Sequence, residues 1–525
     1  MNKNGINEAK NLFDYRFKWD RLMENNSNIN PFSNGMQIEK QTNDFSKSLL
    51  NIHFQDLNDY EKYLKCIILP NSINLKSDGF MGHMTGTVPY FIKQLMNVIT
   101  DLNQNVVKVE TSNILTLIER QVIGTLHDSF FNAGEFFYKK YMQNPNVCLG
   151  IGTSGGTLAN ISAMSFALNR LFSARGSFKG IAQEGIFNTL RYFNFEKVVI
   201  VGSERMHYSI DKAAKLIGLG KDAVIRIKTT TNGTIDIDVL ESTLKSLNQS
   251  GIKILSIVGV AGSTETGSID PLKDLALIAE NYQAHFHVDA AWGGPLIFSE
   301  KYKHLLSGID QADSVTICGH KQLYLPIGIS FCIFKDPDFA SHSENNTAYQ
   351  CKKNSHDLGR YTLEGTRPAS SLLLHALLMA WGAQGIGIVM NNNIKMANYF
   401  SNLIKNEIGF ELFESPKTNI VVYRCRIDES IDFSPEEKLK LENDLNYKIQ
   451  KHMFEHGHDF ISLTELTCRQ KNENENKNVV VFRAVFCNHQ ITEASIQRLI
   501  CSQGLLFKKM LNELHQEVKN VVNLV

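Results

Sequence analysis

Short hydrophobic runs alternate with longer amphipathic segments between residues 110 and 335. The runs are expected to be strands: Cys148–Ile151, Val198–Val201, Ile254–Val260, Ala284–Val288, Ser314–Cys318 and Ile329–Phe334. Between the first two, Leu158, Ile161, Met164 and Leu168 recur at intervals of three and four, which is the period of one helix face. Nearly continuous apolar strands separated by helices predict a mostly parallel sheet that is covered by helices on both sides.

The N-terminal part of the chain has a different pattern. Residues 1–85 are polar and rich in Asn, Lys and Asp, with short helical patches at Leu12–Leu22 and Tyr60–Leu69. Such a segment has too few apolar residues for a core of its own, so we expect an arm that packs on another surface. A partly disordered leader over residues 1–50 is the alternative.

The rest of the chain divides into two predicted domains. Residues 86–390 form the large domain, which ends in a helix over Ser370–Met390. Residues 391–525 alternate helix and strand again and predict a smaller α/β domain, with strands at Ile420–Arg424 and Val479–Val485. Within the large domain, residues 341–358 are polar and aperiodic, and a loop of this length inside a compact domain is commonly functional.

Composition narrows the function classes. The chain of 525 residues carries 54 basic and 54 acidic side chains, and this balance argues against a protein that binds nucleic acid by neutralising phosphates. No window approaches the ~18 consecutive apolar residues of a membrane span, and the first residues lack the apolar stretch of a secretory signal. The nine cysteines are scattered without a Cys-x-x-Cys pair, which indicates free thiols rather than a disulfide frame or a metal site. We expect a soluble cytoplasmic protein with no nucleic-acid or membrane partner.

A glycine-rich segment, Gly150-Ile-Gly-Thr-Ser-Gly-Gly-Thr157, follows one predicted strand and opens a predicted helix. Glycines allow the backbone to approach a ligand closely, and the free amides at a helix start favour a phosphate. The alternative is an ordinary turn with a helix N-cap. The spacing does not match Gly-x-x-x-x-Gly-Lys-[Ser/Thr], so a nucleotide-binding P-loop is disfavoured.

Two further segments place charged side chains at predicted strand ends. Asp289 ends one strand, where open α/β sheets bind ligands, although it could instead cap the next helix. His320 and Lys321 follow another strand, and a lysine there is either a solvated loop residue or a desolvated amine that can form an imine. Pyridoxal phosphate (PLP) presents a phosphate, a ring nitrogen and an aldehyde, and these segments supply one partner for each.

Several motifs between residues 79 and 390 are more specific in combination: Gly82-His-Met-Thr-Gly86, Glu110-Thr-Ser112, Thr153-Ser-Gly-Gly-Thr157, His207-Tyr-Ser-Ile-Asp-Lys-Ala-Ala214, His287-Val-Asp-Ala-Ala-Trp-Gly-Gly294, Gly319-His-Lys321 and Leu363-Glu-Gly-Thr-Arg367. Together they resemble the PLP-dependent group II amino-acid decarboxylases, which include glutamate, aspartate, cysteine-sulfinate and aromatic-amino-acid decarboxylases. The resemblance implies an α/β fold of the fold-type I PLP class, similar to aspartate aminotransferase. It also implies a homodimer whose active site lies at the interface.

The resemblance implies roles for residues around the cofactor ring. Lys321 is expected to hold PLP as a Schiff base, and Asp289 to keep the pyridine nitrogen protonated. His207 is expected to stack on one face of the ring, and Ala291 to lie against the other face. Thr264, in Gly262-Ser-Thr-Glu-Thr-Gly267, matches a threonine near the ring.

The resemblance also implies a phosphate site formed by Ser154, Gly155 and His320. One position departs from the family pattern, because many relatives have Asn-Pro before His-Lys and this chain has Cys318-Gly319. A phosphate contact from position 318 is therefore not expected.

Three residues are candidates for contact with the substrate. Arg367 can bind a carboxylate through two parallel hydrogen bonds, with a purely structural arginine as the alternative. Tyr349 is the only tyrosine in the 341–358 segment; because family members carry a tyrosine on a mobile lid there, it is the expected proton donor, with a packing role as the alternative. Thr85 resembles an active-site loop residue and serves either its own chain or the partner's.

The expected reaction is α-decarboxylation of an L-amino acid with release of CO2. The motifs Gly82-His-Met-Thr and Leu363-Glu-Gly-Thr-Arg are most similar to the bacterial branch proposed as aspartate 1-decarboxylases. We therefore expect an acidic substrate, first aspartate (to β-alanine) and second glutamate (to γ-aminobutyrate). An aromatic amino acid, cysteine sulfinate and 2,4-diaminobutyrate stay open, as do another PLP-dependent lyase or aminotransferase reaction and an inactive PLP-binding interaction protein.

Overall fold

The computed structural model describes Ser46 and residues 57–344, 354–428, 433–456, 459–469 and 476–522. The helical patch expected at Tyr60–Leu69 corresponds to an α-helix followed by a π-helix, α4 (Leu57–Tyr63) and η2 (Leu64–Ile68). The patch expected at Leu12–Leu22 lies outside the described residues.

The large domain is built on a sheet of seven strands in the order β1-β7-β6-β5-β4-β2-β3. β7 is antiparallel to both of its neighbours, and the other strands all run in one direction. This arrangement confirms the expected mostly parallel α/β fold. The strands are β1 (Gly150–Thr153), β2 (Lys197–Ser203), β3 (Val224–Ile227), β4 (Ile252–Val260), β5 (His285–Asp289), β6 (Ser314–Cys318) and β7 (Ser330–Phe334).

Both faces of this sheet are buried, which explains why its strands are hydrophobic without alternation. On β2, Val198 and Ile200 pack into one hydrophobic cluster, whereas Val199 and Val201 pack into another on the opposite face. The first cluster includes residues of α9 (Gly156–Leu171), α10 (Ile181–Phe193) and α11 (Ser209–Leu216). The second includes residues of α5 (Tyr90–Leu102), α7 (Ile114–Phe131), α12 (Ile237–Gln249) and α13 (Leu272–Asn281).

Short helices complete the large domain. Two α-helices flank α7, namely α6 (Val109–Ser112) and α8 (Glu135–Tyr141). The 3-10 helices are η3 (Lys221–Ala223), η4 (Gly294–Phe298), η5 (Lys303–Leu306), η6 (Ile309–Gln311), η7 (Ser341–Ser343) and η8 (Leu358–Arg360).

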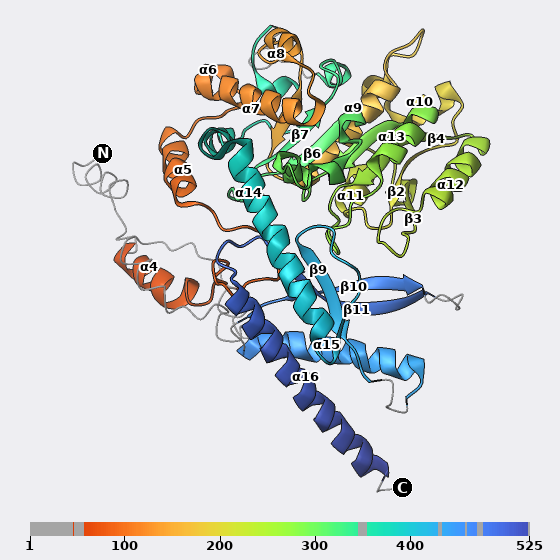
Figure 1. The fold of residues 1–525 in the computed structure, drawn as a ribbon. Coiled ribbons are helices and arrows are strands. Elements are labelled where there is room, and N and C mark those ends of the chain that lie inside the picture. The colour runs from red at the N-terminus through yellow and green to blue at the C-terminus, as the bar shows by residue number, and fades with distance from the viewer. Residues whose placement is uncertain are drawn as a thin grey trace.

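A long helix, α14 (Ser371–Asn406), leads from the large domain into the C-terminal domain (Figure 1). It is broken at Gly382, whose φ of 58° and ψ of −176° lie outside the helical region. Met390 and Ile394 still pack in the core of the large domain, whereas Phe400 and Ile404 belong to the core of the C-terminal domain. α14 therefore continues through the domain boundary expected after residue 390.

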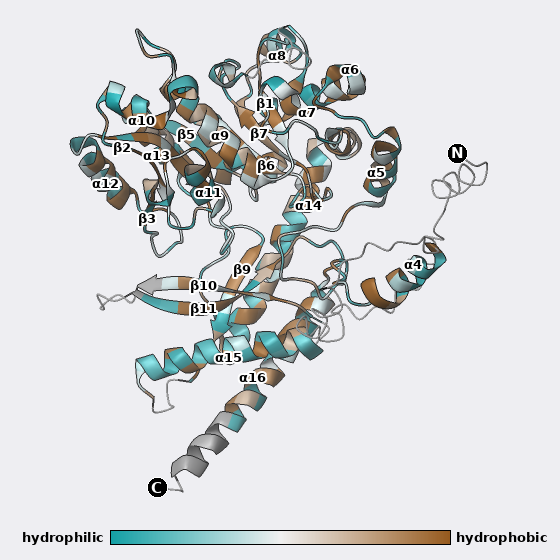
Figure 2. Cartoon of the chain, turned by 180° about the vertical axis from the view of Figure 1, so that it is seen from behind, coloured by the Kyte–Doolittle hydropathy of each residue, from teal (hydrophilic) through white to brown (hydrophobic). Residues whose placement is uncertain are grey.

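The C-terminal domain is a sheet of four antiparallel strands in the order β10-β11-β9-β8. Two helices accompany it, and Figure 2 shows that α15 is largely hydrophilic whereas β9 is hydrophobic. The elements are β8 (Phe410–Leu412), β9 (Ile420–Cys425), α15 (Pro435–His456), β10 (Ser462–Arg469), β11 (Asn476–Val485) and α16 (Glu493–Val522). The two strands expected from the sequence are β9 and β11, and the sequence pattern did not reveal β8 or β10.

Candidate functional site

The predicted cofactor residues lie at one edge of the large sheet. Asp289 is the last residue of β5, and Ser154 and Lys321 lie just beyond β1 and β6. Thr264 and His207 lie beyond β4 and β2. These strands all run in the same direction, so their carboxyl ends meet at a single edge, as in open α/β sheets that bind ligands there.

Asp289 is buried, with only 8% of its surface exposed. Its Oδ2 accepts a hydrogen bond of 2.8 Å from Asn160 Nδ2, and its Oδ1 accepts one of 3.1 Å from the backbone N–H of Ala291. A carboxylate buried in this way needs compensating donors, because an isolated charge costs several kcal/mol to bury. Each oxygen keeps a further lone pair for a cationic or protonated ligand group.

His207 and Lys321 lie within electrostatic reach of Asp289. Burial lowers the pKa of His207, the Asp289 carboxylate opposes this shift, and the Lys321 ammonium adds to it. A neutral imidazole, a carboxylate and an amine are thus gathered at one site, which is the set expected around a pyridine ring.

The glycine-rich segment fits a phosphate. α9 begins at Gly156 without a side-chain cap, and a Cβ at its N-cap Gly155 would have no atom within 4 Å. The backbone N–H of Ser154 donates to Glu364 Oε2 at 3.2 Å, so this loop already binds one anionic oxygen. Among the described residues, His320 Nδ1 is buried with no hydrogen-bond partner, and burial lowers the pKa of His320 to about 4. Free amides and a neutral imidazole are suitable donors to a phosphate.

Cys318 takes the place of the more common asparagine and does not face this loop's open side. It is 1% exposed and its Sγ accepts a hydrogen bond of 3.1 Å from Ser330 Oγ. A Cβ on Gly156 would lie 2.7 Å from Cys318 Sγ, so the thiol packs against the start of α9.

The loop with Thr85 lies against the segment that carries Lys321. A Cβ on Gly86 would lie 3.1 Å from the Lys321 carbonyl oxygen and 2.9 Å from the Tyr324 ring. Only glycine permits this close approach. The neighbouring Thr85 is half-buried.

Arg483, on β11 of the C-terminal domain, reaches the same site and was not expected from the sequence. Its guanidinium donates to three neutral oxygens: Thr264 O at 2.8 Å, Ser462 Oγ at 3.0 Å and Gly82 O at 3.4 Å. It therefore bridges the Thr264 segment and the Gly82–Gly86 loop. Burial lowers the pKa of Arg483, and the Glu265 carboxylate opposes this shift. An arginine inside the apolar run Val479–Val485 was the available signal, because a charge within a buried strand is rarely without a function.

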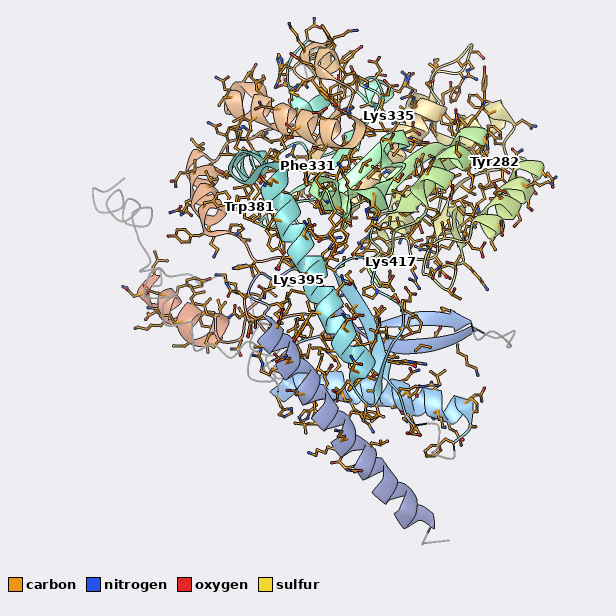
Figure 3. All side chains as sticks on the ribbon, viewed as in Figure 1. Tyr282, Phe331, Lys335, Trp381, Lys395 and Lys417 are labelled. Atoms are coloured by element: carbon orange, nitrogen blue, oxygen red, sulfur yellow. The ribbon has the colours of Figure 1, made fainter. Side chains whose placement is uncertain are left out.

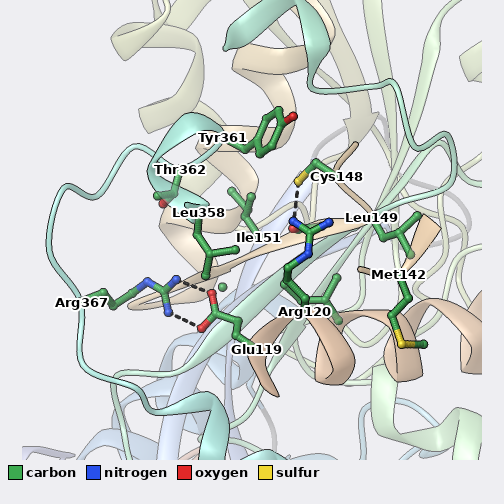
Figure 4. A pocket seen from close by; sticks show the side chains of 13 residues that line it. Glu119, Arg120, Met142, Cys148, Leu149, Ile151, Leu358, Tyr361, Thr362 and Arg367 are labelled. Carbon is green, nitrogen blue, oxygen red and sulfur yellow. Dashed lines mark hydrogen bonds and ion pairs between the residues drawn. The ribbon is translucent and has the colours of Figure 1, made fainter. Parts of the chain in front are cut away.

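Arg367 has a different environment from the one its expected role requires. Its Nη1 and Nη2 donate to the two oxygens of Glu119 at 2.9 and 2.5 Å (Figure 4). Ser371 Oγ donates to the same carboxylate. The side chains of Arg367 and Glu119 are 5% and 1% exposed. Freeing this arginine for a substrate would break a buried ion pair, so the structure favours the alternative, a structural arginine.

Tyr349 lies outside the described residues, and its role stays a prediction. Ala291 is buried next to Asp289, and a Cβ on Gly156 would lie 3.7 Å from the Ala291 Cβ. Ala291 is therefore part of the wall between the phosphate loop and Asp289.

Residues 81–426 match the model of the pyridoxal-dependent decarboxylase conserved domain. The chain belongs to the pyridoxal-dependent decarboxylases. It is 40% identical to an aspartate 1-decarboxylase of Aliivibrio fischeri over 89% of this chain and 86% of that protein. It is 28% identical to an L-2,4-diaminobutyrate decarboxylase of Acinetobacter baumannii over 60% of this chain and 62% of that protein.

The fold of this pyridoxal-dependent decarboxylase agrees with solved structures. The crystal structure of Oryza sativa TDC with PLP and tryptamine superposes with a TM-score of 0.78 at 16% identity, covering 97% of this chain and 99% of that chain. The fold-type I expectation is thereby confirmed. The enzyme is a PLP-dependent amino-acid decarboxylase, as the resemblance implied.

Proposed function

We propose that this enzyme decarboxylates L-aspartate at the α-carbon and releases β-alanine and CO2. The observation that carries the proposal is the 40% identity to an aspartate 1-decarboxylase over most of both chains. Glutamate is the second candidate, since it differs from aspartate by one methylene and presents the same two carboxylates.

We assign the cofactor residues as the motifs suggest. When bound, PLP supplies an electron-withdrawing ring that accepts the electrons left by the departing CO2. Asp289 holds a proton at the pyridine nitrogen, and Lys321 carries the cofactor through its amine. His207 and Ala291 enclose the ring between them. Thr264 completes the site beside the ring.

The phosphate is assigned to Ser154, Gly155 and His320. This assignment is supported by the start of α9, which has no side-chain cap, and by the buried, unpaired Nδ1 of His320 in the described part of the chain. Glu364 must give up its hydrogen bond from the Ser154 amide when the phosphate binds.

We assign the substrate carboxylate to Arg483 in place of Arg367. The hydrogen bonds of Arg483 go to neutral oxygens and the Glu265 carboxylate acts on it only through space, whereas Arg367 donates directly to both oxygens of Glu119. His83 provides a second donor beside it. The His83 Nδ1 accepts the Met84 backbone N–H at 2.7 Å, so the remaining ring proton is on Nε2. Burial, followed by Arg483 and Lys321, lowers the pKa of His83 and keeps it neutral.

Tyr349 is retained as the proposed proton donor to the α-carbon. A proton donor at this carbon is needed because the reacting carbon must be protonated in a controlled way and shielded from water. Thr85 is proposed to contact the substrate on its own chain or the partner's.

We further propose a homodimer. In the described part of the chain, α14 is the one helix that is long and apolar enough to cross a membrane, with only 28% of its most apolar window buried. The break at Gly382 divides it, and Figure 3 labels Trp381 before the break and Lys395 after it. Met379 and Ile388 are 76% and 60% exposed, which is typical of a surface covered by a partner. A monomer at micromolar concentration by light scattering would contradict this proposal.

A cytoplasmic location is proposed with it. The seven cysteines whose side chains are described are all free thiols, which is typical of a reducing compartment. Cell fractionation that recovers the protein outside the cytoplasm would contradict this location.

The function is tested by measuring CO2 and amine release from PLP-loaded enzyme. The panel is aspartate, glutamate, cysteine sulfinate, 2,4-diaminobutyrate, tyrosine and histidine, with the Lys321→Ala variant as the inactive control. We expect β-alanine from aspartate with the highest kcat/KM. A higher value for 2,4-diaminobutyrate or an aromatic amino acid would refute the acidic-substrate proposal, whereas accumulation of an amine form of the cofactor with a 2-oxo acid would indicate an aminotransferase.

A further inference from the structure

Asp289 is one end of a continuous chain of buried hydrogen bonds. Asn160 Nδ2 lies 2.8 Å from Asp289 Oδ2, and Asn160 Oδ1 lies 3.1 Å from His287 Nε2. His287 Nδ1 lies 2.7 Å from Ser314 Oγ, which is 2.8 Å from His285 Nε2. The chain therefore connects β5, β6 and α9 and ends at the carboxylate assigned to the pyridine nitrogen.

The donors and acceptors along this chain are fixed by the Asp289 charge. A carboxylate accepts only, so Asn160 must present its NH2 group to Asp289 and its oxygen to His287. His287 Nε2 therefore carries the proton, and Nδ1 accepts from the Ser314 hydroxyl. Ser314 Oγ in turn accepts from His285 Nε2. Every hydrogen bond thus points toward Asp289, and aligned hydrogen bonds of this kind polarise one another and stabilise the negative end.

Burial makes these tautomers well defined. Asn160 and His287 are 1% and 0% exposed. Burial lowers the pKa of His285 to about 3, and burial likewise lowers the pKa of His287, so both rings are neutral near pH 7. A neutral imidazole has one donor and one acceptor, which is what each position in the chain requires.

Both Nδ2 hydrogens of Asn160 are used in hydrogen bonds. Its second Nδ2 hydrogen reaches Ser209 Oγ at 2.8 Å, at the start of α11. His207 lies two residues before Ser209, and its Nδ1 accepts a hydrogen bond of 3.3 Å from the Ser209 backbone N–H. Asn160 therefore connects the carboxylate at the ring nitrogen to the helix that presents the stacking histidine. Aspartate at this position would oppose Asp289, and an apolar residue would leave His287 without an acceptor.

We propose that Asn160 and His287 are positioning residues that hold Asp289 ionised and oriented, so that the ring nitrogen of bound PLP stays protonated. The inference rests on the role assigned to Asp289 above. It predicts that loss of Asn160 acts on the electron-accepting strength of the cofactor and leaves substrate binding nearly unchanged.

The experiment uses holoenzyme loaded with PLP that carries ¹⁵N in the pyridine ring. In Asn160→Ala, the ¹⁵N resonance is expected to move toward that of the deprotonated ring. We expect kcat to fall about ten- to one-hundred-fold, the range for losing one hydrogen bond to a charged group, and KM to change less than twofold. His287→Phe should give a smaller change in the same direction, and His287→Gln, which restores a donor to Asn160, should recover part of it.

Two controls make the outcomes distinct. His127→Phe removes another buried histidine, which bonds to the Tyr138 hydroxyl at 2.8 Å between α7 and α8, and should lower stability without moving the ¹⁵N resonance. Asp289→Asn should move the ¹⁵N resonance all the way to that of the deprotonated ring. An unmoved resonance in both Asn160→Ala and His287→Phe, with Asp289→Asn moving it, would overturn the inference. An unmoved resonance in Asp289→Asn would instead overturn the Asp289 assignment. If Asn160→Ala does not fold, His287→Phe decides by the same criterion.

Discussion

Two arginines, the buried Arg367 and the half-buried Arg483, should respond in opposite ways when each is replaced by methionine. Arg483→Met is expected to impair catalysis with little loss of stability, and Arg367→Met is expected to do the reverse. The comparison is informative because both arginines lie near the same edge of the large sheet, and the sequence motifs alone favoured Arg367 as the substrate ligand.

The magnitude for Arg483 follows from the hydrogen bonds that it would make to a carboxylate. Each hydrogen bond to a charged group contributes about 1.5–3 kcal/mol, so a two-point contact at the lower end of this range contributes about 3–4 kcal/mol. This corresponds to a fall of about 10²–10³-fold in kcat/KM. The hydrogen bonds that are lost within the protein go to neutral oxygens of Thr264, Ser462 and Gly82. Glu265 loses only one of the three arginines whose charges lower its pKa, so the fold should persist with a modest loss of stability.

The magnitude for Arg367 follows from its buried partner. Glu119 is 1% exposed and would keep only the Ser371 hydroxyl as a donor among the bonds described above. Removing one partner of a buried ion pair costs about 3–5 kcal/mol, because the other charge stays buried without compensation. The double variant Glu119→Gln/Arg367→Met should recover much of this loss, since it leaves no uncompensated charge.

The assays are kcat/KM for CO2 release at saturating PLP and the denaturant midpoint of the holoenzyme. Arg483→Lys serves as the matched variant, because it keeps the charge and loses the two-point geometry. Its kcat/KM should lie between the values of wild type and Arg483→Met. The reasoning is refuted if Arg367→Met loses kcat/KM by 10²-fold at unchanged stability while Arg483→Met remains active.

Four other outcomes are expected. Lys321→Ala should lose turnover and the yellow absorbance of bound cofactor while keeping its fold, and retained absorbance after desalting would contradict its role. Asp289→Asn should retain PLP and lose several orders of magnitude in kcat, as when another orienting carboxylate is neutralised; near-normal kcat would contradict the assignment. Tyr349→Phe should release CO2 yet form carbonyl side products detectable by chromatography, whereas only the normal amine at the normal rate would exclude it as proton donor. Gly86→Ala should lower activity, because its Cβ would lie 2.9 Å from the Tyr324 ring, and wild-type kcat would show that the loop adjusts freely.

Much of the large domain could be predicted from hydrophobic patterning. The six apolar runs correspond to strands of the sheet, because burial on both faces requires continuous apolar residues. β3 was not predicted. It lies at the sheet edge and has the sequence Val-Ile-Arg-Ile. Its Arg226 donates a hydrogen bond of 2.8 Å to Asp211 on α11. The hydrophobic pattern of a short, partly polar edge strand is too similar to that of a loop for the strand to be predicted.

The sequence by itself determined the cofactor class, through the combination of motifs, and the residues expected to meet the cofactor at strand ends. A phosphate loop, a carboxylate and a lysine that follow strands of one direction, here β1, β5 and β6, must converge, because such strands end at a common edge. Lys321, Asp289 and Ser154 could therefore be assigned to one edge of the sheet from the sequence, and their roles stay predictions.

Only the tertiary structure decided which arginine is bound to a carboxylate and what supports Asp289. Arg483 is far from the motifs in sequence and reaches the site through packing of the C-terminal domain on the Gly82–Gly86 loop. Arg367 lies within a motif, but its charge is neutralised by Glu119 from α7. Asn160 looks like an ordinary helix residue until its contacts with Asp289 and His287 are known. Ion pairs and hydrogen bonds act over a few ångströms in space, and no spacing along the chain specifies which side chains come that close.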